Sequence, residues 1–200
     1  MTNIAVMVSG GGTNLQALID NEKAGNIPHG KITLVIASND KAYALQRAAD
    51  AGIASAVVKR KDYADQETFD QAIVDTLHAN NIDMVILAGY LSILGPAVIK
   101  AYEDKILNIH PSLIPSFCGK GFYGLKVHEA ALARGVKVTG ATVHLVNEIP
   151  DGGRILLQKA VYIEDGDTPE VLQRRVMEQA EWILLPKAAE MLAEKLDKGE

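Results

Sequence analysis

Residues 4–12 read Ile4-Ala5-Val6-Met7-Val8-Ser9-Gly10-Gly11-Gly12, an apolar run that ends in three glycines. The run is apolar at consecutive rather than alternate positions, as is a second run, Met84-Val85-Ile86-Leu87-Ala88. Strands of this kind are buried on both faces, which is typical of parallel sheets covered by helices. We therefore predict that both runs are central strands of an α/β sheet.

Around these two runs, short stretches rich in Val and Ile alternate with longer amphipathic stretches, which is the pattern of strand–helix units. The sequence predicts strands near 3–8, 32–37, 55–58, 83–88 and 105–110, and helices near 13–24, 41–51, 66–80 and 95–102. Further on, it predicts a helix near 125–134, β-rich runs at 137–147 and 155–163, and a final helix that begins after Thr168. We expect one α/β domain with a mainly parallel sheet.

The composition supports a globular chain. Of 200 residues, 48% are apolar and 22% are charged, with a net charge of −5 and mixed signs along the chain. These values exclude disorder and a membrane span. Only one compact basic cluster is present, Lys59-Arg60-Lys61, so nucleic-acid binding is not predicted. The start, Met1-Thr2-Asn3, is unlike a secretory signal, so we expect a cytoplasmic location. The single cysteine, Cys118, allows no internal disulfide.

The glycine turn after the first run is a candidate phosphate site. Gly12, Thr13 and Asn14 lie where a strand gives way to a helix, and such a turn offers unpaired N–H groups and a positive dipole end to an anion. It is not a Walker loop, and Leu15 stands where a dinucleotide motif needs its third glycine. The alternative is a tight turn that needs glycine only for its backbone angles.

The sharpest polar feature is Leu107-Asn108-Ile109-His110-Pro111-Ser112. Side chains alternate along a strand, so Asn108 and His110 point the same way at its carboxyl end, where open α/β sheets bind ligands. An amide donor beside a histidine suits a carbonyl that becomes an oxyanion. The alternative is that both side chains only satisfy backbone groups.

A second polar focus is the turn Glu148-Ile149-Pro150-Asp151-Gly152-Gly153-Arg154 between the two β-rich runs. If Asp151 lies against His110, its charge should raise the pKa of the histidine. Of the other histidines, His128 is retained as a candidate, whereas His29, His78 and His144 are weaker ones. No histidines or cysteines have metal-ligand spacing, so no metal site is predicted.

Taken in order, four motifs resemble those of the phosphoribosylglycinamide formyltransferases, a branch of the folate-dependent formyltransferases. They are Ser9–Leu15, Ala88–Leu94, Leu107–Leu113, and Gly140–Val146 followed by Asp151-Gly152-Gly153. The resemblance covers about residues 3–190. It implies a single-domain, Rossmann-like formyltransferase fold over 1–200, in which helices cover both faces of the sheet and the C-terminal part is antiparallel. It also implies a phosphate-binding half, 1–102, and a folate-binding and catalytic half, 103–200.

The resemblance implies transfer of a formyl group from 10-formyltetrahydrofolate, as co-substrate and without a metal, to glycinamide ribonucleotide in purine synthesis. By position, Gly12, Thr13 and Asn14 would hold the substrate phosphate. Asn108 and His110 would stabilise the oxyanion, and Asp151 would keep His110 protonated and help relay a proton. Folate-binding positions would be Leu91, Ser92, Ile93, Leu94 and Asn108.

Two further positions follow from the same resemblance. A basic residue that contacts the glutamate tail of the folate is replaced by Gln66, and Lys59, Arg60 or Lys61 could substitute for it. The substrate-contacting glutamate of the final helix falls on Glu181 if one residue is inserted nearby, and otherwise on Glu178.

The main alternative is a formyltetrahydrofolate hydrolase, which usually carries an additional N-terminal domain that we do not expect in 200 residues. A nicotinamide-dependent oxidoreductase would need the third glycine, and a non-catalytic sensor would not need Asn108, His110 and Asp151. We expect small molecules as the only ligands, with no nucleic acid or membrane partner, and a monomer or homodimer.

Overall fold

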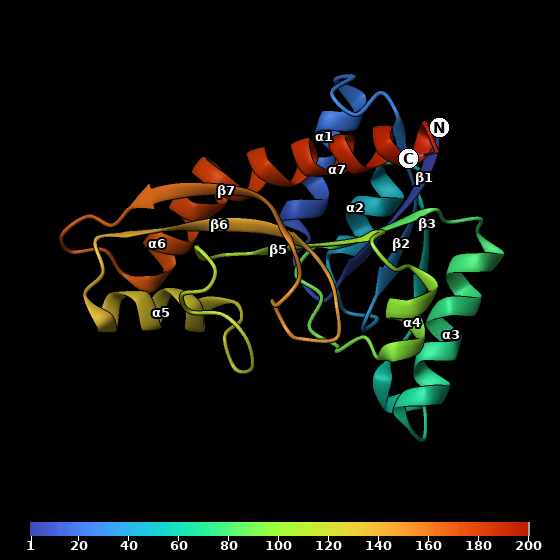
Figure 1. Ribbon diagram of the computed structural model, residues 1–200, viewed down its shortest axis with the longest axis horizontal. Coiled ribbons are helices and arrows are strands. Elements are labelled where there is room, and N and C mark those ends of the chain that lie inside the picture. The colour runs from blue at the N-terminus through green and yellow to red at the C-terminus, as the bar shows by residue number, and fades with distance from the viewer. Residues whose placement is uncertain (200) are drawn as a thin grey trace.

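A computed structural model describes residues 1–199 and contains one seven-stranded sheet of order β3-β2-β1-β4-β5-β6-β7 (Figure 1). The parallel strands are β1 (Thr2–Val8), β2 (Gly30–Ala37), β3 (Ala54–Val57), β4 (Met84–Leu87) and β5 (Ile106–His110). Antiparallel to β5 comes β6 (Val138–Leu145), followed by β7 (Ile155–Tyr162) at the edge. The predicted mixed α/β sheet is confirmed.

The centre of the sheet is formed by β1 and β4, whose side chains enter two separate cores. Ile4, Val6 and Val8 belong to one core with residues of α1 (Thr13–Lys23), α2 (Ala44–Asp50) and α7 (Trp182–Asp197). Ala5 and Met7 belong to the other core, with residues of α3 (Gln66–Ala79) and α4 (Pro96–Ala101). Figure 1 shows α7 and the pair α3 and α4 on different sides of the sheet. This two-sided burial explains why the central runs are apolar at consecutive positions.

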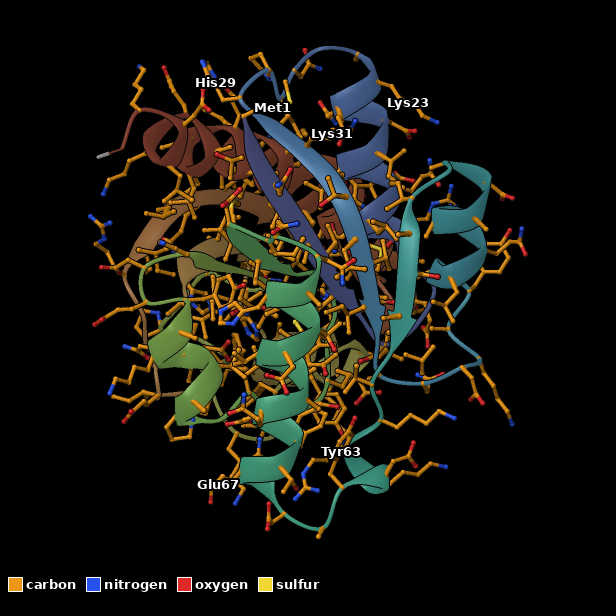
Figure 2. All side chains as sticks on the ribbon, turned by 90° about the vertical axis from the view of Figure 1, so that its right-hand side faces the viewer. Met1, Lys23, His29, Lys31, Tyr63 and Glu67 are labelled. Atoms are coloured by element: carbon orange, nitrogen blue, oxygen red, sulfur yellow. The ribbon has the colours of Figure 1, made fainter. Side chains whose placement is uncertain are left out.

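Different residues lie at the two ends of the sheet. Met1, His29 and Lys31 lie at the end where the parallel strands begin, and Tyr63 and Glu67 lie at the opposite end (Figure 2). The amino group of Met1 pairs with Asp197, so the start of the chain meets the end of α7. No helix among residues 1–199 is long and apolar enough to cross a membrane.

The segment between β5 and α5 (Leu125–Arg134) contains no helix or strand, as predicted for this glycine-rich stretch. Gly119, Gly121 and Gly124 all have positive φ, a conformation that is strained for side chains other than glycine. Glycine at these positions therefore permits the backbone conformation of the loop, which passes over the carboxyl end of β5.

The predicted final helix is interrupted. Thr168 caps α6 (Pro169–Val176) as expected, since its hydroxyl accepts a hydrogen bond from Val171 N at 3.3 Å. A π-helical turn, Met177–Glu181, then separates α6 from α7. Pro186 inside α7 has no N–H to donate to the preceding turn, and the π-helical turn ends five residues before it. The sequence did not predict this interruption.

Candidate active site

The glycine turn forms one wall of a cavity of about 290 Å³. Gly12 is the N-cap of α1 with φ of 71°, and no side chain caps the helix there. A Cβ at Gly12 would lie 2.7 Å from Ala44 Cβ, so both the backbone angle and the close approach of α2 require glycine. Thr13 and Asn14, the other two residues of the predicted phosphate site, line the same cavity.

The other walls come from segments that are far apart in the sequence. They are the segment after β4 (88–91), the end of β5, residues 122–124 of the glycine-rich loop, Asp151 in the β6–β7 turn, and Gln173, Met177 and Glu181 of the C-terminal helices. The cavity therefore lies at the carboxyl ends of β1, β4 and β5, the position expected for an open α/β sheet.

Asn108, His110 and Asp151 meet in this cavity. Asn108 Nδ2 lies 3.4 Å from Asp151 Oδ1, and His110 Nδ1 lies 3.6 Å from Asp151 Oδ2. Asp151 has φ of 55°, an uncommon conformation for a residue other than glycine, and its carboxylate accepts a hydrogen bond from Gly119 N at 2.8 Å. The turn thus brings the carboxylate back over the end of β5.

Asp151 acts on the pKa of His110 in the predicted direction, but the net shift is opposite to the predicted rise. Burial lowers the pKa of His110 below its ordinary value, although Asp151 and the Phe117 carbonyl, 2.9 Å from His110 Nε2, both act to raise it. Only 5% of the imidazole is exposed, so the loss of water outweighs one carboxylate at 3.6 Å. Burial also raises the pKa of Asp151, but His144, Gly119 and His110 together hold it below its ordinary value.

His144, a weaker candidate from the sequence, is a polar neighbour of Asn108 and Asp151. It lies opposite Asn108 in the β5–β6 pairing, with its Nε2 atom 3.1 Å from Asn108 Nδ2 and 3.5 Å from Asp151 Oδ1. Its Nδ1 atom lies 2.8 Å from the Leu145 carbonyl oxygen. Because a carbonyl oxygen only accepts, Nδ1–H donates to it, and this hydrogen bond orients the ring so that Nε2 faces both Asn108 and Asp151.

Glu181 and Asn14 link the C-terminal helices to the glycine turn. Asn14 Nδ2 donates to Glu181 Oε2 at 2.7 Å, and Glu181 is 5% exposed. Burial raises the pKa of Glu181 to about 7, although the Asn14 hydrogen bond acts to lower it. Glu178, the other predicted position, pairs with Arg174 and does not line the cavity. Glu181 is the last residue of the π-helical turn, whose hydrogen bonds span five residues rather than the four of an α-helix.

A second cavity of about 160 Å³ adjoins the first. Tyr90, Asn108 and Asp151 line both cavities. Three of the predicted folate positions, Ser92, Ile93 and Leu94, line the second cavity, whereas Leu91 lines the first. Asn108 and Asp151 therefore stand where molecules bound in the two cavities would meet.

Gln66 lies beside the predicted folate segment. Its Nε2 atom donates to Ile93 O at 3.1 Å and to the buried Asp70 Oδ1 at 2.6 Å, and its Oε1 atom accepts from Arg60 Nε at 3.3 Å. Of the three basic residues that could substitute at the folate tail, Lys59 pairs with Asp40. The structure therefore places the guanidinium of Arg60 directly beside Gln66.

Two further residues considered from the sequence, His128 and Cys118, lie off the cavity walls. His128 is fully buried on α5, and its ring nitrogens have no hydrogen-bond partner among residues 1–199. Burial and the nearby His110 lower the pKa of His128 to about 4, so its ring is neutral at neutral pH. Cys118 is a partly exposed loop residue whose thiol donates to the Pro115 carbonyl, and burial raises its pKa. Among residues 1–199, no three His, Cys, Asp or Glu side chains group as a metal site would require.

A family model described as formyl transferase matches residues 2–188. The chain belongs to the formyl transferase family. Phosphoribosylglycinamide formyltransferase of Haemophilus influenzae is 44% identical over 90% of this chain and 82% of its own length. The crystal structure of glycinamide ribonucleotide transformylase 1 from Symbiobacterium toebii has a TM-score of 0.91 and 41% identity, and the match covers 97% of this chain and 88% of that one. The predicted family and fold are confirmed.

Other members of the formyl transferase family are longer than this chain. The chloroplastic phosphoribosylglycinamide formyltransferase of Vigna unguiculata is 38% identical over 96% of this chain, which spans 61% of that protein. The trifunctional purine biosynthetic protein adenosine-3 of Gallus gallus is 41% identical over 95% of this chain, which spans 18% of it.

Proposed function

We propose that this protein transfers the formyl group of 10-formyltetrahydrofolate to the amine of N1-(5-phospho-D-ribosyl)glycinamide, a step of purine biosynthesis. The observation that carries the proposal is the pair of adjoining cavities that share Asn108 and Asp151. A transferase must bring donor and acceptor together at its reacting groups, and this arrangement has one cavity for each. The names of the relatives favour this transfer over hydrolysis of the formyl donor.

In the first cavity, the free N–H groups of the glycine turn suit the substrate phosphate, and Glu181 suits a ribose hydroxyl. In the second cavity, backbone groups of the segment 91–94 suit the pterin ring. The acceptor amine then lies near Asp151, and the formyl carbonyl lies near Asn108 and His110. This pose puts the forming C–N bond between the two cavities.

The reaction forms a bond between the amine nitrogen and the formyl carbon and then breaks the bond from that carbon to N10 of the folate. Asn108 Nδ2, oriented by His144, donates to the oxyanion of the tetrahedral intermediate. The negative charge that develops on this oxygen favours the protonated form of His110, which acts as proton donor. Asp151 relays the proton that the amine loses to His110, and His110 gives a proton to the departing N10, so the proton lost by the amine is the proton gained by N10.

For the folate tail, we propose that Arg60 supplies the cation that Gln66 lacks. The guanidinium is 3.3 Å from Gln66, which itself contacts the 91–94 segment. Arg60 also donates to the Tyr63 carbonyl oxygen at 3.0 Å, and Figure 2 shows Tyr63 at the end of the sheet opposite Met1. A guanidinium at that place suits a carboxylate because it can form two parallel hydrogen bonds.

The test is the absorbance change of a 10-formyl folate with purified protein, measured with and without glycinamide ribonucleotide. Consumption that requires the ribonucleotide supports the transferase. Consumption without it would instead establish the hydrolase, and no consumption in either case would refute the proposal.

A further inference from the structure

The charge on the first cavity wall does not suit a phosphate by itself. Among the described residues, the wall includes two carboxylates, Asp151 and Glu181, but no Lys or Arg. A phosphate dianion in this cavity must therefore be stabilised by backbone N–H groups and by cations that lie behind the wall. The guanidinium of Arg47, on α2, lies directly behind the glycine turn.

Arg47 is held by three contacts on the side of the turn away from the cavity. Its Nε atom donates to the Gly11 carbonyl oxygen at 2.8 Å, and one terminal nitrogen donates to Gln16 Oε1 of α1 at 3.0 Å. The guanidinium also lies over the ring of Tyr43, 5.1 Å from its centroid. These contacts tie α1, α2 and the glycine turn together.

The contacts with α2 determine where the N–H groups of the turn point. The Gly10 carbonyl accepts from Ala44 N at 3.2 Å, and the next carbonyl, that of Gly11, accepts from Arg47. In a planar trans peptide the C=O and N–H bonds point in opposite directions. The N–H groups of Gly11 and Gly12 therefore point away from α2, and neither has an acceptor among residues 1–199.

We propose that Arg47 is a positioning residue for phosphate binding: it holds the Gly11 peptide so that the N–H groups of the turn converge on the anion, and it adds a positive charge behind them. The inference rests on the proposed function for the identity of the substrate. The anion site itself is defined by the turn and can be tested with inorganic phosphate alone.

The experiment compares the wild-type protein with Arg47→Ala and with Lys41→Ala, a control that removes the same charge from an exposed position near the turn. Inorganic phosphate binding is measured by calorimetry, and steady-state kinetics are measured with glycinamide ribonucleotide and with the same substrate lacking its phosphate. For Arg47→Ala we expect about tenfold weaker phosphate binding and a similar rise in KM for the ribonucleotide, which corresponds to about 1.4 kcal/mol. We expect kcat to be little changed, and the unphosphorylated substrate to be used as by the wild type.

Wild-type phosphate binding in Arg47→Ala, or an equal loss in Lys41→Ala, would overturn the proposal. Equal losses with both substrates would show a general structural role and would also overturn it. If Arg47→Ala does not fold, Arg47→Lys decides, because it keeps the charge but lacks the two separate nitrogens, fixed in one plane, with which the guanidinium contacts Gly11 O and Gln16 Oε1. We then expect phosphate binding to weaken at least about threefold, and unchanged binding would contradict the proposal. Phosphate binding without formyl transfer in the wild type would refute the proposed function but not this inference.

Discussion

Replacing Glu181 by Gln should remove much of the pH dependence of stability that this one group creates. Its folded-state pKa is raised to about 7 from 4.5, so the folded protein binds more protons than the unfolded chain between these values. Stability from Glu181 is therefore fully present below about pH 4.5 and is lost as the pH rises through about 7. Since one pKa unit is worth about 1.4 kcal/mol, the loss amounts to about 3 kcal/mol.

The assay is urea unfolding of the wild type, Glu181→Gln and Glu178→Gln at several pH values between 4.5 and 8. At an m-value of about 2 kcal/mol/M, the unfolding midpoint of Glu181→Gln should rise by about 1.5 M relative to wild type between these limits. Glu178→Gln is the matched control, because Glu178 is an exposed residue of the same π-helical turn and should follow the wild type. Parallel curves for Glu181→Gln and wild type would refute the reasoning that burial displaces this pKa.

Three further predictions concern the reacting groups and the folate tail. His110→Ala should lower the chemical rate by about 10²- to 10⁴-fold with substrate binding largely kept, and near-normal single-turnover rates would argue against a proton donor at this position. Asp151→Asn removes a charge that opposes the effect of burial, so the pKa of His110 should fall further and the ring should lose its proton at lower pH; an NMR titration of the imidazole that matches wild type would contradict this. Arg60→Ala should raise KM for a folate with its glutamate tail but not for one without it, whereas Lys61→Ala should change neither, and equal effects of both variants would exclude a specific role for Arg60.

Local pattern was enough to predict much of this fold. Consecutive apolar residues from Ile4 to Val8 required two buried faces, and alternation along β5 put Asn108 and His110 on one side. The glycines after Asp151 marked a turn that could bring its carboxylate to them. Each of these predictions uses only the order of adjacent residues, which determines local geometry whatever the distant contacts are. The structure agrees with all of them for this reason.

The features that were missed depend on contacts between distant segments. His144 faces Asn108 only because β6 pairs with β5 in one register, and no local rule gives that register. The pKa of His110 was predicted to rise because its carboxylate partner could be guessed, whereas its burial under the loop at Phe117 could not. The choice between Glu181 and Glu178 depended on a π-helical turn that sequence periodicity does not reveal.

Burial displaces the pKa values of two polar groups of the site in opposite directions, and in each case it favours the neutral form. It lowers that of His110 and raises that of Glu181, so the free cavity near neutral pH carries less charge than its residues would in water. In the proposed reaction, the bound substrate supplies the missing partners, since a developing oxyanion favours protonated His110 and a hydroxyl donor favours ionised Glu181. His110 and Glu181 therefore become charged next to the substrate and only when it is bound. This is expected for a site that stabilises the transition state more than the ground state.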